Sequence, residues 1–209
     1  MDILSKLNTR YATKVFDSTK KVSEADMEKL LEAIRLSASS YGLQPYKVLV
    51  VEDPKIRAEL RKVAWDQPQI TDASALIVFA VNNETNEKSV DDFISLIAQT
   101  RNLSKESLEG YNNMMTGSLQ NLNKEQVETW VSKQAYIALG FGLVSAAVLG
   151  IDTCPMEGFS PDDFDRILNL NKRGLKSKVI MAVGYRSEED KYQHLAKVRQ
   201  KKEDFFVTI

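Results

Sequence analysis

The spacing of apolar residues along the chain predicts an alternation of helices and short strands. Apolar positions recur every three to four residues in seven segments, and capping residues such as Ser23 and Ser160 mark some of their starts. These segments are residues 3–10, 24–37, 54–63, 86–100, 105–120, 124–149 and 161–168. The pattern therefore predicts more helix than strand.

Three β-branched runs predict buried strands over residues 46–51, 75–81 and 177–184. A further β-type segment, Cys154–Gly158, is broken by a proline and a glycine. The last residues, Asp204–Ile209, form an apolar β-type tail. Because an unpaired apolar strand promotes aggregation, we expect this tail to pair with a sheet edge in its own subunit or in a partner. Three or four buried strands among many helices indicate the α+β or α/β class.

The segment 124–149 is apolar around most of its circumference, which predicts a buried helix. It contains Gly140 and Gly142, but a GxG inside a helix that follows no strand is not a nucleotide-binding fingerprint. We expect these two glycines to allow close packing of the helix.

Composition narrows the possible chemistry. The chain has 209 residues, 28 Lys and Arg against 29 Asp and Glu, a formal net charge of −1, one His and one Cys. Without repeats or a linker, residues 1–209 are expected to form one domain, since a chain of this size can bury about 70% of its surface. The single Cys and His exclude an intrachain disulfide framework, a cysteine-rich zinc site and a His-pair metal site. The balanced charge argues against a nucleic-acid binder.

The chain shows no apolar run as long as a membrane span, and its first residues lack the basic and apolar regions of a signal peptide. We therefore expect a soluble cytoplasmic protein with no membrane partner. Cys154 is expected to be a buried structural thiol, and His194 a surface residue rather than a catalyst. An enzyme of this composition would take its reactive group from a bound cofactor.

Four local segments combine cations or flexible backbone with the boundaries of predicted elements. They are Arg10–Lys14, Ser37–Pro45, Cys154–Gly158 and Lys197–Arg199. Taken singly, each is compatible with a solvated turn or a plain loop. Together, the cations at positions 10, 14, 197 and 199 could surround a dianionic phosphate, which charge-assisted hydrogen bonds and bidentate arginines suit well.

Five motifs follow one another along the chain. They are Arg10-Tyr-Ala-Thr-Lys-x-Phe16, Ser39-Ser-x-x-x-Gln-Pro45, Gln67-Pro-Gln-Ile-Thr-Asp-Ala-Ser74, Pro155-Met-Glu-Gly158 and Lys197-x-Arg199. In this order they resemble the FMN-dependent nitroreductase family, and above all its branch of oxygen-insensitive NAD(P)H nitroreductases and dihydropteridine reductases. The resemblance covers nearly the whole chain.

The resemblance implies an α+β homodimer with a central, mostly antiparallel sheet flanked by helices. Its C-terminal tail would be exchanged or packed across the dimer, and two FMN sites would lie at the interface. The residues expected at the FMN phosphate are Arg10, Tyr11, Ala12, Lys197 and Arg199. The residues expected along the flavin ring are Lys14, Pro155, Met156, Glu157 and Gly158, joined by Ser39 and Ser40 of the other subunit.

The chain also departs from the pattern of the family. Asp66 and Gln67 stand where an Asn commonly contacts FMN, and the sequence leaves open which one replaces it. The residues expected near the substrate or NAD(P)H are Lys14, Tyr41, Gln69, Met115 and Thr116. Gln69 stands where some relatives carry a nicotinamide-contacting Lys, so the preference between NADH and NADPH stays open.

The reaction that the resemblance implies is a ping-pong transfer in which NAD(P)H passes hydride to flavin N5, and a nitroaromatic or quinone then takes it. Two alternatives stay open. One is a different FMN reaction on the same scaffold, such as dihydropteridine, enone or flavin reduction. The other is a non-catalytic FMN-binding redox sensor, whose acceptor pocket would be closed by Tyr41 and the 105–120 helix.

Overall fold

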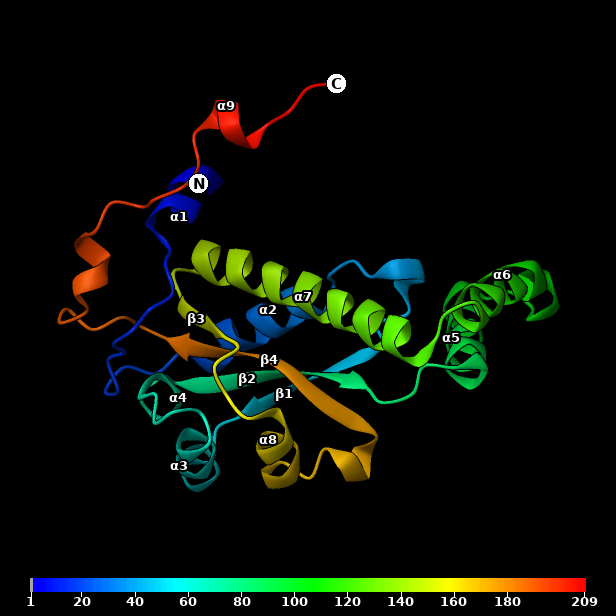
Figure 1. Ribbon diagram of the computed structural model, residues 1–209, viewed down its shortest axis with the longest axis horizontal. Helices are drawn as coiled ribbons and strands as arrows, with labels where there is room; N and C mark the ends of the chain where they lie inside the picture. The colour runs from blue at the N-terminus through cyan, green and yellow to red at the C-terminus, as the bar shows by residue number, and fades with distance from the viewer. Residues whose placement is uncertain (1) are drawn as a thin grey trace.

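A computed structural model describes residues 2–209 of the chain, and its centre is a four-stranded sheet (Figure 1). The strand order is β1-β2-β4-β3, and every neighbouring pair is antiparallel. The strands are β1 (Tyr46–Val51), β2 (Ala75–Asn82), β3 (Asp152–Met156) and β4 (Leu175–Gly184). The α+β expectation is thus confirmed, and the Pro-containing segment supplies the fourth strand.

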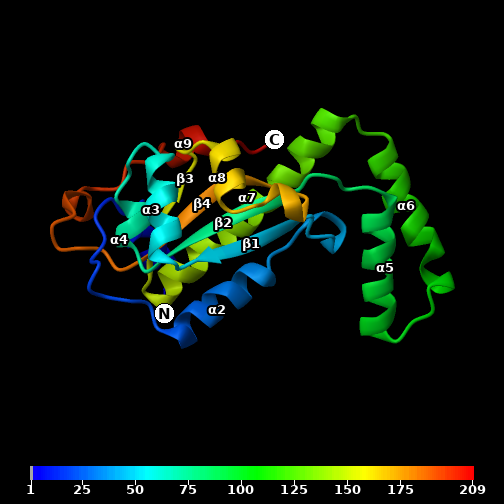
Figure 2. The ribbon, with the colours of Figure 1, turned by 90° about the horizontal axis from the view of Figure 1, so that it is seen from below.

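Helices cover both faces of this sheet (Figures 1 and 2). One face packs against α2 (Glu24–Arg35) and α7 (Lys124–Leu149). The other face packs against α3 (Pro54–Lys62), α4 (Gln69–Asp72) and α8 (Pro161–Ile167).

Side-chain alternation along β2 explains the two cores. Ile77 and Phe79 belong to the core under α2 and α7, whereas Leu76 and Val78 belong to the core under α3 and α8. Because successive side chains of a strand point to opposite faces, one continuous apolar run fills both layers.

Two further helices, α5 (Glu87–Arg101) and α6 (Glu109–Gln120), form a helical hairpin that projects from the body (Figures 1 and 2). The hairpin has its own small core of Val90, Ile94, Ile97, Met115 and Leu119. Helix α6 begins at Glu109 rather than at the expected residue 105, because residues Glu106–Leu108 form a 3-10 turn. The short helix α1 (Ile3–Thr9) completes the expected set.

The structure corrects the expectation that the longest helix is buried all round. Three apolar residues on one side of α7, Ile137, Phe141 and Val148, are 40%, 43% and 41% exposed. We call them the apolar stripe. The sheet and α2 cover the opposite side of α7, and within the described residues the apolar stripe stays partly open to solvent.

The structure confirms the expected close helix packing at only one of the two glycines of α7. A Cβ on Gly142 would lie 3.1 Å from Cε of Met181 and 3.2 Å from Ile34, so α2 and the sheet approach α7 closely there. A Cβ on Gly140 would meet no atom within 4 Å. The expectation was therefore wrong for Gly140, which lies away from the core.

By length and composition, α7 also passes as a membrane span, with 26 residues and a mean hydropathy of 1.3 in its most apolar window. This differs from the expectation that no apolar run is long enough. Within the described chain, 44% of that window is buried against the rest of the protein.

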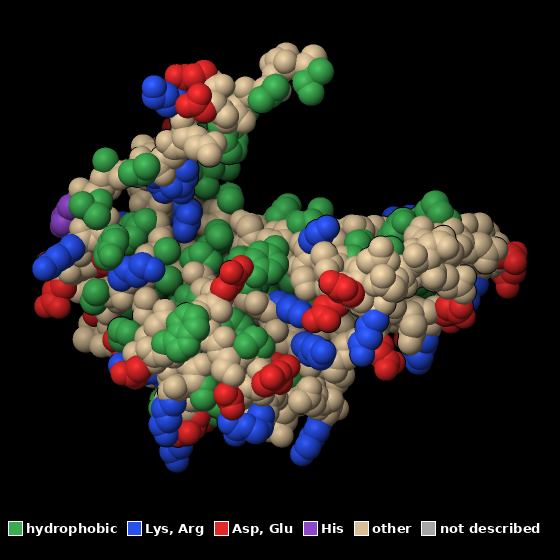
Figure 3. Space-filling model, viewed as in Figure 1, with side chains coloured by type: hydrophobic (Ala, Val, Ile, Leu, Met, Phe, Trp, Pro, Cys, Tyr) green, Lys and Arg blue, Asp and Glu red, His purple; other side chains and the backbone are tan. Residues whose placement is uncertain are grey.

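The C-terminal tail is not a strand of its own subunit's sheet. Residues Lys202–Phe205 form a one-turn helix, α9, and Phe205 and Phe206 are 65% and 67% exposed. Figure 3 shows hydrophobic side chains exposed on this tail and on the side of the body that faces it. Residues 206–209 pair with no strand of the described chain, so of the two expected pairings only the one with a partner stays a prediction.

Candidate functional site

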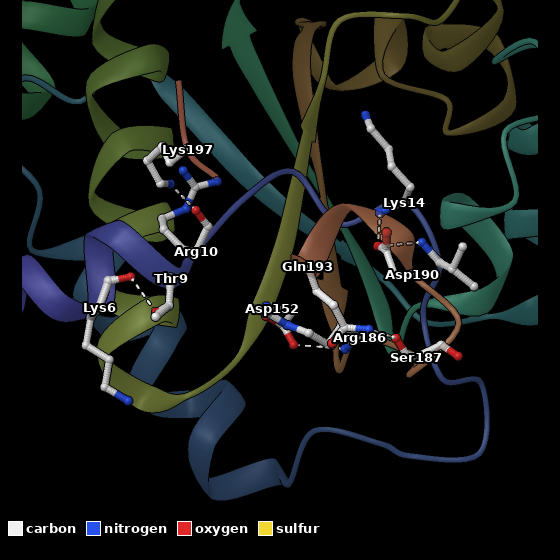
Figure 4. A network of polar contacts seen from close by, with 11 residues as sticks. Lys6, Thr9, Arg10, Lys14, Asp152, Arg186, Ser187, Asp190, Gln193 and Lys197 are labelled. Carbon is white, nitrogen blue, oxygen red and sulfur yellow. Dashed lines mark hydrogen bonds and ion pairs between the residues drawn. The ribbon is translucent and has the colours of Figure 1, made fainter. Parts of the chain in front are cut away.

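Cations from the two ends of the chain meet beside β3. Lys197 donates a hydrogen bond from Nζ to the backbone oxygen of Arg10, the residue that ends α1 (Figure 4). Burial and the charge of Arg199 lower the pKa of Arg10. Burial and the charges of Arg10 and Arg199 lower the pKa of Lys197. Arg10, Lys197 and Arg199, which we call the cation cluster, therefore lie within electrostatic reach of one another.

The cation cluster has the properties of an anion site. Among the described residues, no carboxylate forms an ion pair with any of its three members, and Nε of Arg10 is buried without a hydrogen-bond partner. Like charges held together cost free energy, which a dianionic group between them would offset. The residues present therefore fit the phosphate that the sequence led us to expect.

A buried carboxylate holds the N-terminal part of this site in place. Asp190 accepts hydrogen bonds from the backbone N–H groups of Lys14 (2.7 Å), Val15 (3.1 Å) and Tyr192 (3.0 Å). Burial alone would raise the pKa of Asp190, but these backbone bonds outweigh it and hold the pKa below its ordinary value. Figure 4 shows Lys14 and Asp190 together, with Lys14 reaching away from the backbone.

The other side of the same segment rests on β3. Ala12 forms a parallel bridge with Thr153, and the N–H of Thr13 donates to the Thr153 oxygen at 3.1 Å. The ring of Tyr11 lies 4.6 Å from the guanidinium of Arg186. Segment 10–15 is thus fixed between the edge of the sheet and the chain that follows β4.

Cys154 lies on β3 between the expected ring and phosphate residues. Its side chain is 1% exposed, and burial raises the pKa of its thiol, while Lys14 and Arg10 act in the opposite direction. Its expected role as a buried structural thiol fits this environment. His194 is exposed, as expected of a surface residue.

The loop after β3 lies against residues from the start of α4. Nε2 of Gln67 donates to the Gly158 oxygen at 2.7 Å, whereas Asp66 forms an exposed ion pair with Arg61. Of the two positions that the sequence left open, only Gln67 is thus turned toward the loop. The hydroxyl of Tyr136 on α7 donates to the carboxylate of Glu157, and burial with this contact raises the pKa of Tyr136 to about 12.

Sequence reasoning missed Trp65 and Tyr136 at this loop. A Cβ on Gly158 would lie 2.3 Å from Cζ3 of Trp65, so the indole packs directly on the glycine backbone while 75% of Trp65 stays exposed. Trp65 and Asp66 both have a φ of 54°, a conformation that is strained for residues other than glycine. The signal available in the sequence is a Trp two residues before the Gln67 motif.

Several expected residues lie away from this cluster. Gln69 is 7% exposed and Met115 is fully buried in the hairpin core, so both would have to become accessible before they could contact a ligand. Thr116 lines a separate cavity of about 770 Å³ between the hairpin and the body.

The loop Ser37–Pro45, here called the serine loop, is also remote from the cation cluster. The N–H of Ser40 donates to Gln134 on α7, whereas Arg10 shares a cleft with Ala147 near the other end of that helix. At 1.5 Å per residue, the thirteen residues from 134 to 147 span about 20 Å. One chain therefore does not bring Ser39 and Ser40 to the cation cluster.

An antiparallel sheet between two helical layers, with a cation cluster at one edge, defines an α+β protein suited to an anionic ligand. The model of the nitroreductase family matches residues 7–185. The chain is 40% identical over 210 residues to a protein of Staphylococcus haemolyticus named as a candidate NAD(P)H nitroreductase, covering 97% of this chain and 94% of that one. The chain belongs to the nitroreductase family.

Solved structures share its fold. A candidate nitroreductase from Exiguobacterium sibiricum, crystallised in complex with FMN, matches with a TM-score of 0.85 and 19% identity over 100% of this chain and 98% of that one. A gut-bacterial enone reductase matches with a TM-score of 0.83 and 18% identity over 100% and 98% of the two chains. At these identities the likeness concerns the fold.

We expect Asp190→Asn to lower the free energy of unfolding by about 1.5–3 kcal/mol at pH 7, since a charged acceptor of three N–H groups is lost. Because the folded pKa of Asp190 lies below its unfolded value, the wild-type advantage is present above about pH 4 and shrinks as the pH falls through the folded pKa. Urea unfolding at pH 7 and pH 3 measures both effects.

The control is Asp53→Asn, because Asp53 also accepts two backbone N–H bonds but caps an exposed helix, where Asn serves nearly as well. Equal loss in the two variants would contradict the central role of Asp190.

Proposed function

We propose that this chain is an FMN-dependent NAD(P)H oxidoreductase. The observation that carries the proposal is the cation cluster, in which Arg10, Lys197 and Arg199 lack carboxylate partners among the described residues and Nε of Arg10 is buried without a partner. Membership of the nitroreductase family and the FMN complex of a protein with the same fold support it.

The phosphate of FMN would be held by the cation cluster, with Tyr11 and Ala12 beside it. The ring would lie along the loop Pro155–Gly158, where Gln67 holds the Gly158 carbonyl and keeps the adjacent backbone in one orientation. Lys14 would stand at the polar edge of the ring, because a cation there favours the anionic reduced flavin. Ser39 and Ser40 would come from the partner subunit.

Bound FMN would supply flavin N5, the atom that exchanges hydride with NAD(P)H and with the acceptor. Neither His194 nor Cys154 is needed for this chemistry. The proposed acceptors are nitroaromatics or quinones, reduced in a ping-pong cycle in the cytoplasm, where NAD(P)H is available. Other reactions on the same scaffold, including dihydropteridine, enone or flavin reduction, and a non-catalytic redox sensor are the alternatives.

Purified protein should bind FMN and show flavin absorbance, and it should oxidise NADH or NADPH when a quinone is supplied. Rates against a panel of nitroaromatic, quinone, enone, pteridine and free-flavin acceptors separate the catalytic alternatives. A sensor would bind FMN without rapid bleaching by NAD(P)H in stopped flow. A colourless protein that neither binds added FMN nor turns over would refute the proposal.

Arg199→Ala should weaken FMN binding by about 1.5–3 kcal/mol, which is the contribution of one charged hydrogen bond. Fluorescence titration with FMN measures it. Lys201→Ala and His194→Gln are matched controls, because both are exposed residues of the same segment outside the cation cluster. If all three variants bind FMN equally, Arg199 does not belong to the site.

We also propose that the protein is a homodimer in which the apolar stripe of α7 lies at the interface. Three observations support this: the uncovered stripe, the exposed aromatic tail, and the separation of about 20 Å between the serine loop and the cation cluster. The tail would pair with an edge of the partner's sheet, where β1 is an edge strand.

Phe141→Asp should convert the dimer into monomers and abolish tight FMN binding, because a charge cannot be buried unpaired in an apolar contact. Light scattering measures the mass of the particle, and FMN titration measures the affinity. Ile56→Asp on α3, at the opposite face of the sheet and 37% exposed, is the control that should remain dimeric. A wild-type monomer that binds FMN tightly would contradict the shared site.

A further inference from the structure

The serine loop has an unusual backbone. Tyr41, Gly42 and Gln44 have φ values of 60°, 81° and 46°, so three of four successive residues adopt left-handed conformations. For residues other than glycine this costs about 1–2 kcal/mol each. Such strain persists only where surrounding contacts fix the chain, so we asked which contacts hold this loop.

Tyr41 is bonded to α6 at two points. Its hydroxyl donates to Oγ of Ser118 at 3.0 Å, and the hydroxyl of Tyr111 donates to the Tyr41 backbone oxygen at 3.1 Å. The two tyrosine rings meet edge to face, with centroids 6.5 Å apart. Ser118 donates its own proton to the Met114 oxygen at 2.9 Å, which leaves its oxygen free to accept from Tyr41. We call the contact between Tyr41 and Ser118 the latch.

Contacts with α7 fix the other side of the loop. The Ser40 N–H donates to Oε1 of Gln134 at 2.8 Å, and Nε2 of Gln134 donates to the Trp130 oxygen at 3.0 Å. Gln134 is 3% exposed, so this support is part of the core. The serine loop is thus held between the buried side of α7 and the projecting hairpin.

The hairpin is the less anchored of these two supports. It projects from the body, as Figures 1 and 2 show. It has its own core, against which Leu43 of the serine loop and Trp130 of α7 pack. A displacement of α6 would act on the serine loop through the latch, because the Tyr41 hydroxyl and carbonyl are both engaged with that helix.

We propose that Tyr41 is a positioning residue: the latch transmits the position of the hairpin to Ser39 and Ser40, and thereby sets the affinity for FMN in the partner's site. This inference rests on the proposed function, in which those serines contact FMN. It also gives a role to the Tyr that this chain carries after the two serines.

The latch itself is tested without cofactor. In FMN-free protein, hydrogen exchange of the Gly42 and Leu43 amides, which bond to the Ser39 and Ser40 oxygens, should accelerate in Tyr41→Phe and in Ser118→Ala. The matched control is Ser95→Ala on α5, whose hydroxyl makes the same kind of bond to the carbonyl four residues earlier and bonds to no residue of the serine loop. Unchanged exchange in both latch variants would show that the contact between Tyr41 and Ser118 does not hold the serine loop in place.

The consequence is tested by FMN titration. Tyr41→Phe and Ser118→Ala should each raise the dissociation constant about threefold to tenfold, as expected for one neutral hydrogen bond, and the double variant should be no weaker than either single one. Ser95→Ala should bind like the wild type. Wild-type affinity in the latch variants, with faster exchange, would overturn the link to FMN. A wild-type protein that binds no FMN would instead refute the proposed function.

Discussion

The buried carboxylate of Asp190 is the contact on which the candidate site depends. It joins the segment that carries Arg10 and Lys14 to the segment that leads to Lys197 and Arg199, although the bonded residues Lys14 and Asp190 are 176 positions apart. One side chain thereby assembles cations from both ends of the chain at the edge of β3. Its own charge is stabilised by backbone N–H groups, so it neutralises none of the cation cluster.

In this arrangement the carboxylates stabilise the fold, whereas the cations are available to a ligand. The carboxylates near the site are engaged elsewhere: Asp190 with backbone N–H groups, Asp152 with Arg186, and Glu157 with Tyr136. The positive charge of the cluster is therefore left for a ligand. The serine loop shows the same division. The Tyr41 hydroxyl and the Ser40 N–H bond to the protein, whereas the hydroxyl of Ser40 has no hydrogen-bond partner among the described residues.

Local patterns predicted most of the fold, because helix periodicity, caps and β-branched runs are properties of neighbouring residues. They located β2 as a buried strand and the capped start of α2 at Ser23. They failed where the outcome depends on what covers a surface. The apolar circumference of α7 indicated burial all round, but its apolar stripe is exposed in the described chain, and the tail pairs with no strand there.

The site was predictable as a set of motifs and not as a set of contacts. The sequence indicated the cations, but not the 176-residue link through Asp190, and it could not tell that Gln67 faces Gly158 while Asp66 faces Arg61. Met115 and Thr116 are adjacent in the sequence, yet one is in the hairpin core and the other lines a cavity. Such distinctions depend on which side of a helix faces the body, and the polar pattern of α6 defines that side only weakly.

The distance in sequence between Lys14 and Asp190 has a consequence for biosynthesis. At about 5–20 residues per second, a ribosome adds the 176 residues between them in roughly 10–35 s. β3 and its sheet neighbour β4 are both made late in that interval. The nascent chain thus has its first helices and the β1–β2 pair well before it can fix segment 10–15. The proposed cofactor site is consequently complete only in chains whose synthesis has passed Asp190, and a prematurely released fragment lacks the contact that holds segment 10–15.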